Sequence, residues 1–331
     1  MNPPKVNDQE YLNFLMATPK GCSGTEAARV QPAGEAMPAP DAFTRRLHRL
    51  EPDAATRWRE AAGPVERQGG IWVVDASTLD KPYAQTIDVV QRHGSGKHPA
   101  VVEGINWITL LWTEGDRHGP VAYRLYDKAR DQLTTNDPFP ALLTTAPARG
   151  FVPAGMGFDG GYSSLVHLKR IAGWGWSWLT RLNANRLVNP PRRGLCAVAR
   201  VDTDTHGTLG HLKGDGLVRW FKLVALDGDI EWGASNALKL SSLTRVRWAG
   251  YAWTIEPYHR GIKQFCGVER AQGRAARAQR NHLGLCLRAF LRLEHHCHCA
   301  GLSWFEAKTA IIRPAVRAYL ANPLYTLPAT A

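Results

Sequence analysis

The sequence predicts a mixed α/β fold in which one sheet is flanked by helices. Short apolar runs that end in an acidic residue occur at 71–75 and 155–159, as expected of strands buried on both faces. Between residues 136 and 182, strand signals alternate with helix signals, which is typical of α/β organisation. A helical N-terminal region precedes this part, and a β-rich segment interrupts it before the helical C-terminal part.

The composition favours a polyanionic partner. The chain has 331 residues, enough for one large domain or two to three small ones. Lys and Arg outnumber Asp and Glu by 41 to 29, which gives a formal net charge of +12. Nucleic acid is the commonest partner of such a chain, although a merely soluble basic protein would carry the same charge.

The spacing of the cysteines and the lengths of the apolar segments indicate where in the cell the protein is expected. The six cysteines lack the spacing of a disulfide framework, and no run of eighteen apolar residues occurs. The N-terminus lacks the basic and then apolar layout of a signal peptide. We therefore expect a cytoplasmic protein.

Residues 1–66 predict short helices. Helical spacing of apolar residues occurs near Tyr11, Ser23 or Thr25 can cap a helix through residues 26–29, and after the break at 31–40 Pro40 opens another helix that runs to about residue 50. This helix carries the basic residues Arg45, Arg46, His48 and Arg49. Two such helices would suit a DNA reader of the helix-turn-helix kind, but the break at 31–40 is longer than that motif's usual turn. A plain helical packing domain is the alternative.

Strand signals dominate from residue 71 to about 126. Four apolar or β-branched runs predict an antiparallel meander with the first strand central, namely 71–74, 86–90, 105–111 and 121–126. The basic turn at 92–98, which includes Lys97, is a candidate contact for a phosphate backbone. A solvated hairpin tip would have the same sequence, and Lys81 is open to the same two interpretations.

Two segments further along supply candidate DNA contacts. A strand is predicted at 174–182, where three tryptophans alternate and point to one face, so that Trp176 could stack on an unpaired base. Packing of these rings beneath a helix is the alternative. From about 185 to 238 the sequence is β-rich, and its Pro-Pro-Arg-Arg stretch places Arg192 and Arg193 as candidate DNA contacts.

A helix around residues 253–265 carries the third acidic residue of interest. Its apolar stripe consists of Ile255, Tyr258, Ile262 and Phe265. Glu256, Arg260 and Lys263 share a different face, and Pro257 predicts a kink or a helix start beside the acid. Pairing of Glu256 with Arg260 along the helix is the structural alternative, and it would contribute only a few tenths of a kcal/mol.

A basic stripe follows this helix. Arg270, Arg274 and Arg277 recur at three- and four-residue intervals, with Arg280 after them. Such a stripe can lie along phosphates and release counterions. A solvated helix face would show the same spacing.

Three acids far apart in the sequence are candidates for one metal centre. A carboxylate such as Asp75 at the end of a buried strand needs a cation or another partner. Asp159 and Glu256 are the acids that could join it, and two Mg²⁺ ions can share a carboxylate about 4 Å apart. Two ions so placed would activate a nucleophile and stabilise the departing oxygen of a phosphodiester, while Lys263 and Arg260 would hold phosphate oxygens.

The residues around these acids resemble the three acidic motifs of bacterial insertion-sequence transposases of the Asp-Asp-Glu class. The resemblance rests on the stretches 74–82, 158–164 and 253–263, is supported by 179–186 and 277–283, and runs from about residue 10 to the end. It implies a ribonuclease H-like catalytic fold, a mixed sheet flanked by helices with an all-β insertion. It also implies that Asp75, Asp159 and Glu256 ligate two Mg²⁺ ions, for which Mn²⁺ can substitute.

The resemblance extends to the Tyr-Arg-Glu-Lys branch of that class, with one departure. Lys263 matches the lysine of this motif, seven residues after Glu256. Where the motif has Arg and Tyr before the Glu, this chain has Ala252 and Ala249. Arg247 and Tyr251 lie nearby and could take over their role.

The function implied is that of a DNA transposase. Such an enzyme binds terminal inverted repeats, cleaves at the element ends and joins the 3′-hydroxyls to target DNA, acting as a homodimer on DNA. The implied domains are a DNA-binding region at 1–66, a catalytic domain at 67–300 with its insertion at about 185–238, and a C-terminal helix at 301–331. The alternatives are a catalytically silent DNA-binding protein derived from a transposase and a metal-dependent DNA nuclease.

Overall fold

The computed structural model of the chain describes residues 5–19, 23–32, 37–51, 58–60, 63, 65–95, 100–126, 137–203, 206–224 and 228–323. Lys97 lies outside the described residues. The chain forms two compact units. We call Pro64–Pro82 with Val90–Tyr258 the sheet unit, and Met1–Gly63, Tyr83–Val89 and His259–Ala331 the helical unit.

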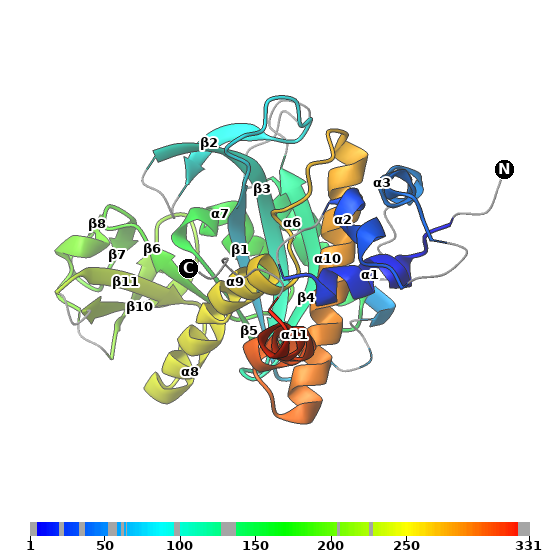
Figure 1. Cartoon of the computed structure of the whole chain (residues 1–331). Coiled ribbons are helices and arrows are strands. Elements are labelled where there is room, and N and C mark those ends of the chain that lie inside the picture. The colour runs from blue at the N-terminus through cyan, green and yellow to red at the C-terminus, as the bar shows by residue number, and fades with distance from the viewer. Residues whose placement is uncertain are drawn as a thin grey trace, which may run out of the picture. The chain divides into compact units, whose positions relative to one another are not determined.

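The sheet unit is built on one mixed sheet, whose described strands number eleven (Figure 1). Its order is β2-β3-β1-β5-β6-β11-β10-β9-β7-β8, with β4 also paired to β3. The strands are β1 (Ile71–Asp80), β2 (Gln91–Ser95), β3 (Ala100–Thr113), β4 (His118–Tyr126), β5 (Gly155–Phe158), β6 (Trp178–Leu182), β7 (Leu187–Asn189), β8 (Cys196–Ala197), β9 (Thr208–Leu212), β10 (Leu217–Val224) and β11 (Ile230–Ser235).

The strand β1 lies between β3 and β5, and only its β3 side is antiparallel. The predicted antiparallel meander with the first strand at its centre is wrong, because β3 is the strand that pairs with β1, β2 and β4. β3 pairs with β1 and with β4 in antiparallel fashion, whereas β1, β5 and β6 run parallel. The chain crosses between the parallel strands through α6 (Pro138–Ala148) and α7 (Leu165–Gly173). The alternation of strands and helices predicted for 136–182 is therefore confirmed.

The β-rich segment continues the same sheet. β11 pairs with β6 in antiparallel fashion, with Gly233 opposite Arg181, and β10 pairs with β11, with Phe221 opposite Gly233. Residues directly opposite one another in such pairs project from the same face. One face of the sheet is therefore continuous from β1 through β6 into the β-rich segment.

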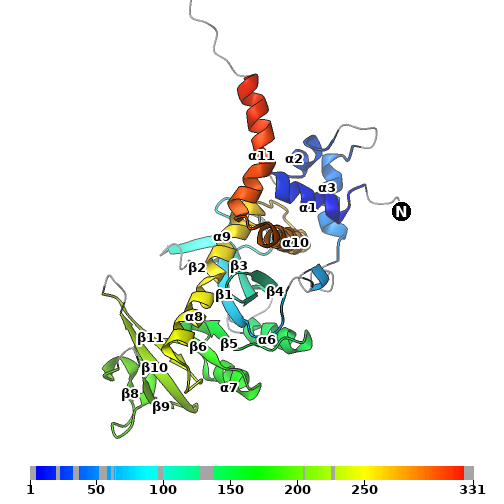
Figure 2. The same ribbon diagram turned by 90° about the horizontal axis from the view of Figure 1, so that it is seen from below.

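Helices cover both faces of the sheet (Figure 2). On one face, Phe139 of α6 packs against Phe158, with ring centroids 5.7 Å apart, and Trp72, Trp112 and Phe151 contact one another at 4.6–4.8 Å. On the other face lies α8 (Ser242–Trp253), which packs against β1, β5 and β6. These aromatic side chains are buried and form much of the core.

Two of the predicted strands are wrong in part. The stretch 86–90 is not a strand, because Asp88 joins the helical unit, where its backbone N donates to the Arg274 carbonyl and its carboxylate accepts from the Ala276 backbone N. The strand β2 instead occupies residues 91–95, part of the predicted basic turn. The strand predicted at 174–182 begins only at Trp178, because α7 runs to Gly173 and Gly175 turns the chain at φ 76°.

The helical unit contains α1 (Asp8–Ala17), α2 (Gly24–Arg29), α3 (Pro40–Arg49), α10 (Ala276–Ala300) and α11 (Trp304–Ala321). Arg288 of α10 connects parts of this unit through ion pairs. Its guanidinium nitrogens lie 2.6 Å from a carboxylate oxygen of Asp8 and 2.9 Å from one of Glu60. Ser303 and Glu306 form a capping box at the start of α11. None of the helices described is long and apolar enough to cross a membrane.

Candidate active site

The pairing of β1 with β5 places the first two acids next to each other. β5 runs beside β1 only as far as the pair Val74 and Phe158, so Asp75 and Asp159 are the next residues on two neighbouring parallel strands. Such strands lie about 4.8 Å apart. The prediction that the first strand ends at Asp75 is wrong, because β1 continues to Asp80 against β3. What ends at Asp75 is the partner strand, and this leaves the side of β1 open there.

Asp159 leaves the sheet immediately. It caps the 3₁₀ turn η1 (Gly160–Tyr162), and its Oδ1 accepts a hydrogen bond of 2.6 Å from the backbone N of Gly160. Its side chain is exposed, whereas Asp75 is only partly exposed. The two acids therefore differ in environment although they are neighbours.

Two contacts bring the third acid over the same face. A Cβ on Gly157 would lie 2.8 Å from the Cβ of Ala252, so α8 approaches β5 very closely at this point. Further along, the Tyr258 ring lies 5.9 Å from that of Trp107 on β3, at the start of α9 (Ile255–Phe265). Glu256 lies between these two anchors.

The strand register shows what lies beneath Glu256. Gly157 is paired with Val73 and Trp107 is paired with Ser77, so the two anchors flank Asp75 on β1. Gly157 is the glycine that matters here, because any side chain on it would displace the helix that leads to Glu256. The predicted helix start beside Pro257 is confirmed, since α8 ends at Trp253 and α9 begins at Ile255.

The acids influence one another electrostatically. The pKa of Asp75 is raised to about 7, chiefly by burial and further by the charges of Glu256 and Asp159, while a hydrogen bond from the Ala76 backbone opposes the rise. The pKa of Tyr162 is also raised, by burial and by the charges of Asp75 and Asp159. We call Asp75, Asp159 and Glu256 the acid cluster.

Tyr162 is a neighbour of the acid cluster that the sequence did not single out. It is buried, and its ring stacks on Phe139 at 5.1 Å. The available signal was its place in Asp159-Gly-Gly-Tyr162, three residues after an acid. Three residues in a 3₁₀ turn bring the tyrosine back beside the residue that caps the turn.

The carboxylates of the acid cluster suit Mg²⁺ if each ion is bound by two of them at a time. Within the described part of the chain, no three His, Cys, Asp or Glu side chains converge on one metal position. Mg²⁺ in enzymes of phosphate chemistry commonly takes only one or two carboxylates, and substrate oxygens and water complete its shell. In a two-metal site one carboxylate is shared. Asp75 lies between two acids and is suited to be the shared one.

The predicted phosphate-binding cations on α9 differ in their surroundings. Arg260 is exposed to solvent. Lys263 is mostly buried, and its Nζ lies 3.1 Å from Oε1 of Glu269. Lys263 would therefore have to exchange a carboxylate for a phosphate in order to bind DNA.

Several of the predicted DNA contacts in the helical unit have protein partners. Arg45 pairs with Asp41 and Arg46 with Asp8, whereas Arg49 is exposed. Arg270 donates to the Pro19 carbonyl, and Arg277 pairs with Glu51 and donates to the Arg49 and Leu50 carbonyls.

The basic stripe predicted at 270–280 is not a continuous helix face. Residues 266–275 are not helical, so Arg270 and Arg274 precede α10, whereas Arg277 lies in its first turn. Intervals of three and four residues indicate a stripe only where the backbone is helical throughout.

The predicted contacts in the sheet unit lie on several surfaces. Arg192 and Arg193 are exposed in a turn, where Arg192 has a φ of 62°. Trp176 lies outside the strand, and its ring contacts that of Trp174 at 5.1 Å. Lys81 is 3% exposed, and its backbone N donates to the Glu103 carbonyl.

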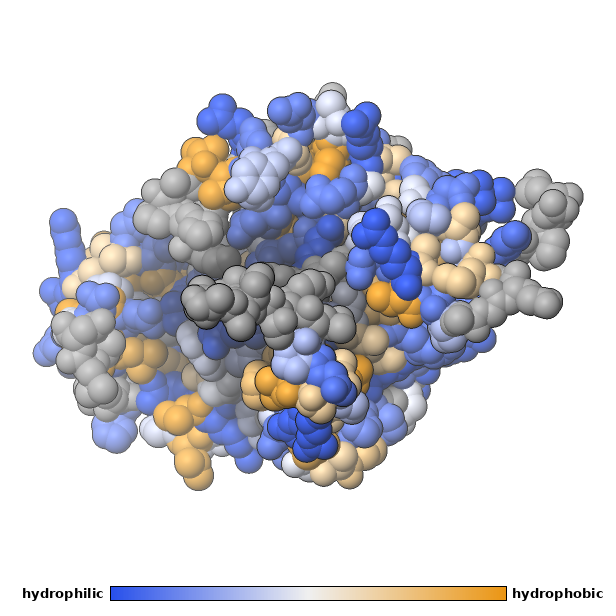
Figure 3. Space-filling view, in the orientation of Figure 1, coloured by the Kyte–Doolittle hydropathy of each residue, from blue (hydrophilic) through white to orange (hydrophobic). Residues whose placement is uncertain are grey.

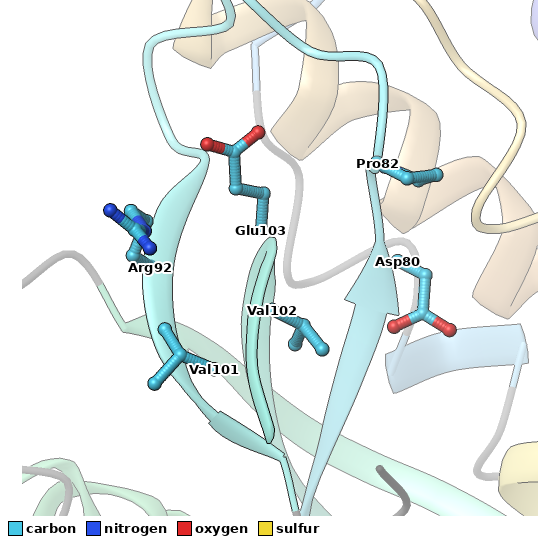
Figure 4. Close-up of a pocket in the computed structure, with 6 residues that line it drawn as sticks. All are labelled: Asp80, Pro82, Arg92, Val101, Val102 and Glu103. Atoms are coloured by element: carbon cyan, nitrogen blue, oxygen red, sulfur yellow. The ribbon is translucent and has the colours of Figure 1, made fainter.

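A cavity of about 450 Å³ lies beyond the acid cluster on the same strand (Figure 4). It is lined by Asp80, Pro82, Arg92, Val101, Val102 and Glu103. Asp80 is five residues beyond Asp75, or about 16 Å along an extended strand. The cavity is therefore separate from the acid cluster. On the face shown in Figure 3, hydrophilic residues predominate.

Comparison with known proteins identifies a fold. No protein-family profile matches the sequence, and no curated protein matches it. The structure is similar to that of a piggyBac transposase solved by cryo-electron microscopy as a synaptic complex with hairpin DNA, with a TM-score of 0.54 and 11% sequence identity. The match covers 100% of this chain and 80% of that chain. The chain thus has a transposase-like fold.

Proposed function

We propose that the protein is a DNA transposase of the Asp-Asp-Glu class, a metal-dependent polynucleotidyl transferase. The observation that carries the proposal is the acid cluster, in which Asp75 and Asp159 are neighbours on parallel strands and the pKa of Asp75 is raised by burial and further by the charges of Glu256 and Asp159. Like charges are held together at a cost, which a bound cation would offset. The similar transposase structure, solved with DNA, supports the same reading.

The order of the strands supports a ribonuclease H-like core. Three strands are antiparallel, β4-β3-β1, and two more, β5 and β6, are parallel to the central β1. This arrangement explains why Asp75 and Asp159 are neighbours, because β1 carries the first and β5 is followed directly by the second. The β-rich segment would be the insertion of this class, attached through β11 to β6.

Asp75, Asp159 and Glu256 would hold two Mg²⁺ ions, with Asp75 shared between them. Bound ions would supply activation of the attacking water or 3′-hydroxyl and stabilisation of the departing oxygen. The exposure of Asp159 and Glu256 leaves the acid cluster accessible to a duplex. Arg260 would bind phosphate oxygens, and Lys263 would do so once it is released from Glu269.

The departure from the Tyr-Arg-Glu-Lys motif at residue 252 has a structural explanation. The close approach of Ala252 to Gly157 leaves no space for a long side chain at that position. The small residue therefore allows α8 to lie low on the sheet, and the phosphate contact of the motif's arginine would have to come from another residue. Arg247, which is exposed on the same helix, was the sequence-based candidate.

The DNA partners would be the terminal inverted repeats of a mobile element and a target duplex, bound by a homodimer. The N-terminal helices would contribute to end recognition. Arg49 is the residue of α3 best placed for this role, because it is exposed while Arg46 is paired with Asp8.

Cleavage of DNA that flanks the coding region tests the proposal. Fragments of a few hundred base pairs from each side would be incubated with the protein and Mg²⁺, with Asp75→Asn as the inactive variant. Asp80→Asn, which removes a carboxylate from the same strand outside the acid cluster, is the matched control. We expect cleavage by the wild type and by Asp80→Asn, and none by Asp75→Asn.

The products separate the alternatives. Joined products identify a transposase, whereas cleavage without joining indicates a metal-dependent nuclease. Binding of the flanking DNA without cleavage in Mg²⁺ or Mn²⁺ would contradict the proposal and indicate a silent DNA-binding protein.

A further inference from the structure

Arg245 is a mostly buried arginine that has no anionic partner among the described residues. This residue of α8 is 8% exposed, and its Nε is buried without a hydrogen-bond partner among the described residues. The contact of its guanidinium is with the Phe221 ring of β10, 4.4 Å from the ring centroid. Burial lowers the pKa of the group, but a guanidinium stays charged at any physiological pH.

Arg288 shows how this chain satisfies an arginine whose role is structural. Its side chain is 12% exposed and pairs with Asp8 and Glu60, which accept from its guanidinium at 2.6 to 2.9 Å. Buried charges in proteins are normally paired in this way. Arg245 lacks such a pair within the described chain, so its burial is better explained by a ligand than by stability.

Arg245 lies over the same face of the sheet as the acid cluster. It precedes Trp248 and Ala252 by three and seven residues, so all three project from one side of α8. Trp248 and Ala252 lie over Gly155 and Gly157 of β5.

The strand pairing leads to the same conclusion. Phe221 is paired with Gly233, and Gly233 with Arg181. Two residues along β6, Leu179 pairs with Gly157, which pairs with Val73, two residues before Asp75. Phe221 and Asp75 therefore project from one face, which α8 covers.

We propose that Arg245 binds a phosphate of the DNA strand whose scissile bond lies at the acid cluster. This inference rests on the proposed function. Arg245 lies eight residues, or about 12 Å, before the end of α8, and Glu256 lies in the first turn of α9, so several nucleotides of a duplex strand separate the two side chains. The planar guanidinium, held against Phe221, would offer its edge to phosphate oxygens. The N-terminal end of α8 would add a favourable dipole.

DNA binding without metal tests this assignment separately from catalysis. The probe is a 40-base-pair duplex of mixed sequence in EDTA, titrated at several KCl concentrations. The variants are Arg245→Met, which keeps the length and removes the charge, and Arg170→Met, which removes the same charge from an exposed position on α7. Arg245→Lys keeps the charge and removes the planar group.

We expect Arg245→Met to bind about tenfold more weakly and to lower the slope of log K against log salt by about one. Arg170→Met should change that slope by less than half as much. The melting temperature of Arg245→Met should equal or exceed that of the wild type, since an unpaired buried charge has been removed. Should Arg245→Met fail to fold, Arg245→Lys must keep the wild-type slope while losing affinity.

The assignment is overturned if Arg245→Met binds DNA with the affinity and slope of the wild type, or if Arg170→Met weakens binding and lowers the slope as much as Arg245→Met does. A fall in melting temperature with unchanged binding would make Arg245 structural and would also overturn it. These outcomes leave the cleavage test untouched. If the wild type binds no duplex at any salt concentration, the proposed function itself fails.

Discussion

A Cβ added to Gly157 would lie 2.8 Å from the Cβ of Ala252, so β5 and α8 are in close contact through a glycine and an alanine. This contact determines how low α8 lies on the sheet, and with it the position of Glu256 one turn further on. The relationship connects a packing constraint to the geometry of the acid cluster.

Replacing Gly157 with alanine should therefore impair activity more than stability. The added methyl group forces α8 away from β5, at a cost of about 1–3 kcal/mol in the free energy of unfolding. Glu256 should move with the helix, and because small displacements in an active site cost large factors in rate, we expect cleavage to fall at least tenfold. Chemical unfolding and single-turnover cleavage measure the two effects. Gly173→Ala is the control, since a Cβ there would have no neighbour within 4 Å among the atoms described; an equal loss of activity in this control would contradict the explanation.

The raised pKa of Asp75 predicts a pH-dependent stability. The group has a pKa of about 7 in the folded protein and about 3.9 in the unfolded chain, so the folded protein holds the extra proton between these values. The stability associated with that proton is complete below pH 4 and is lost as the pH rises to 7. Asp75→Asn should therefore melt at a higher temperature than the wild type at pH 8 in EDTA, and at the same temperature near pH 4.

The lowered pKa of His259 predicts that stability depends on pH with the opposite sign. Burial, aided by the charge of Lys263, lowers the pKa of this imidazole to about 3, whereas that of an unfolded histidine is about 6.5. The unfolded chain then binds the extra proton, and stability is lost as the pH falls from 6.5 towards 3. His259→Gln should lose less melting temperature between pH 7 and pH 4.5 than the wild type does. Equal losses would show that His259 is not the group responsible.

The ion pairs of Arg288 should contribute measurably to stability. Replacing Arg288 with methionine leaves Asp8 and Glu60 without this partner, and partial exposure moderates the cost to about 2–4 kcal/mol. Urea unfolding of Arg288→Met and Arg245→Met would compare two arginines of similar burial. The free energy of unfolding should fall strongly in Arg288→Met and should not fall in Arg245→Met. Equal losses in the two variants would contradict the distinction between a structural arginine and one that binds a ligand.

The sequence predicted those features of the site that depend on neighbouring residues. Asp159 follows a short apolar run, and Pro257 follows Glu256, so the end of β5 and the start of α9 could be read from neighbouring residues. The alignment of Asp75 with Asp159 is a property of strand pairing. Before the structure was known, these two acids were linked only by the repeated pattern of an apolar run that ends in Asp and by the resemblance to a family.

The predictions that failed depended on distant partners. The run at 86–90 has the composition of a strand, but Asp88 is held by Arg274 and Ala276, nearly two hundred residues away. Likewise, nothing near Arg245 in the sequence indicates that it is buried against Phe221. The importance of Gly157 and Ala252 is visible only in the packing of α8 on β5.

The most direct test of the account is whether the three acids act as one unit. Single-turnover cleavage of the flanking DNA in Mg²⁺ would be measured for Asp75→Asn, Asp159→Asn, Glu256→Gln and the triple variant, with Asp80→Asn as the control. Residues of one catalytic unit are strongly non-additive, so each single variant should lose nearly as much activity as the triple variant, while the control keeps it. Near wild-type cleavage by any one of the three single variants would contradict the account.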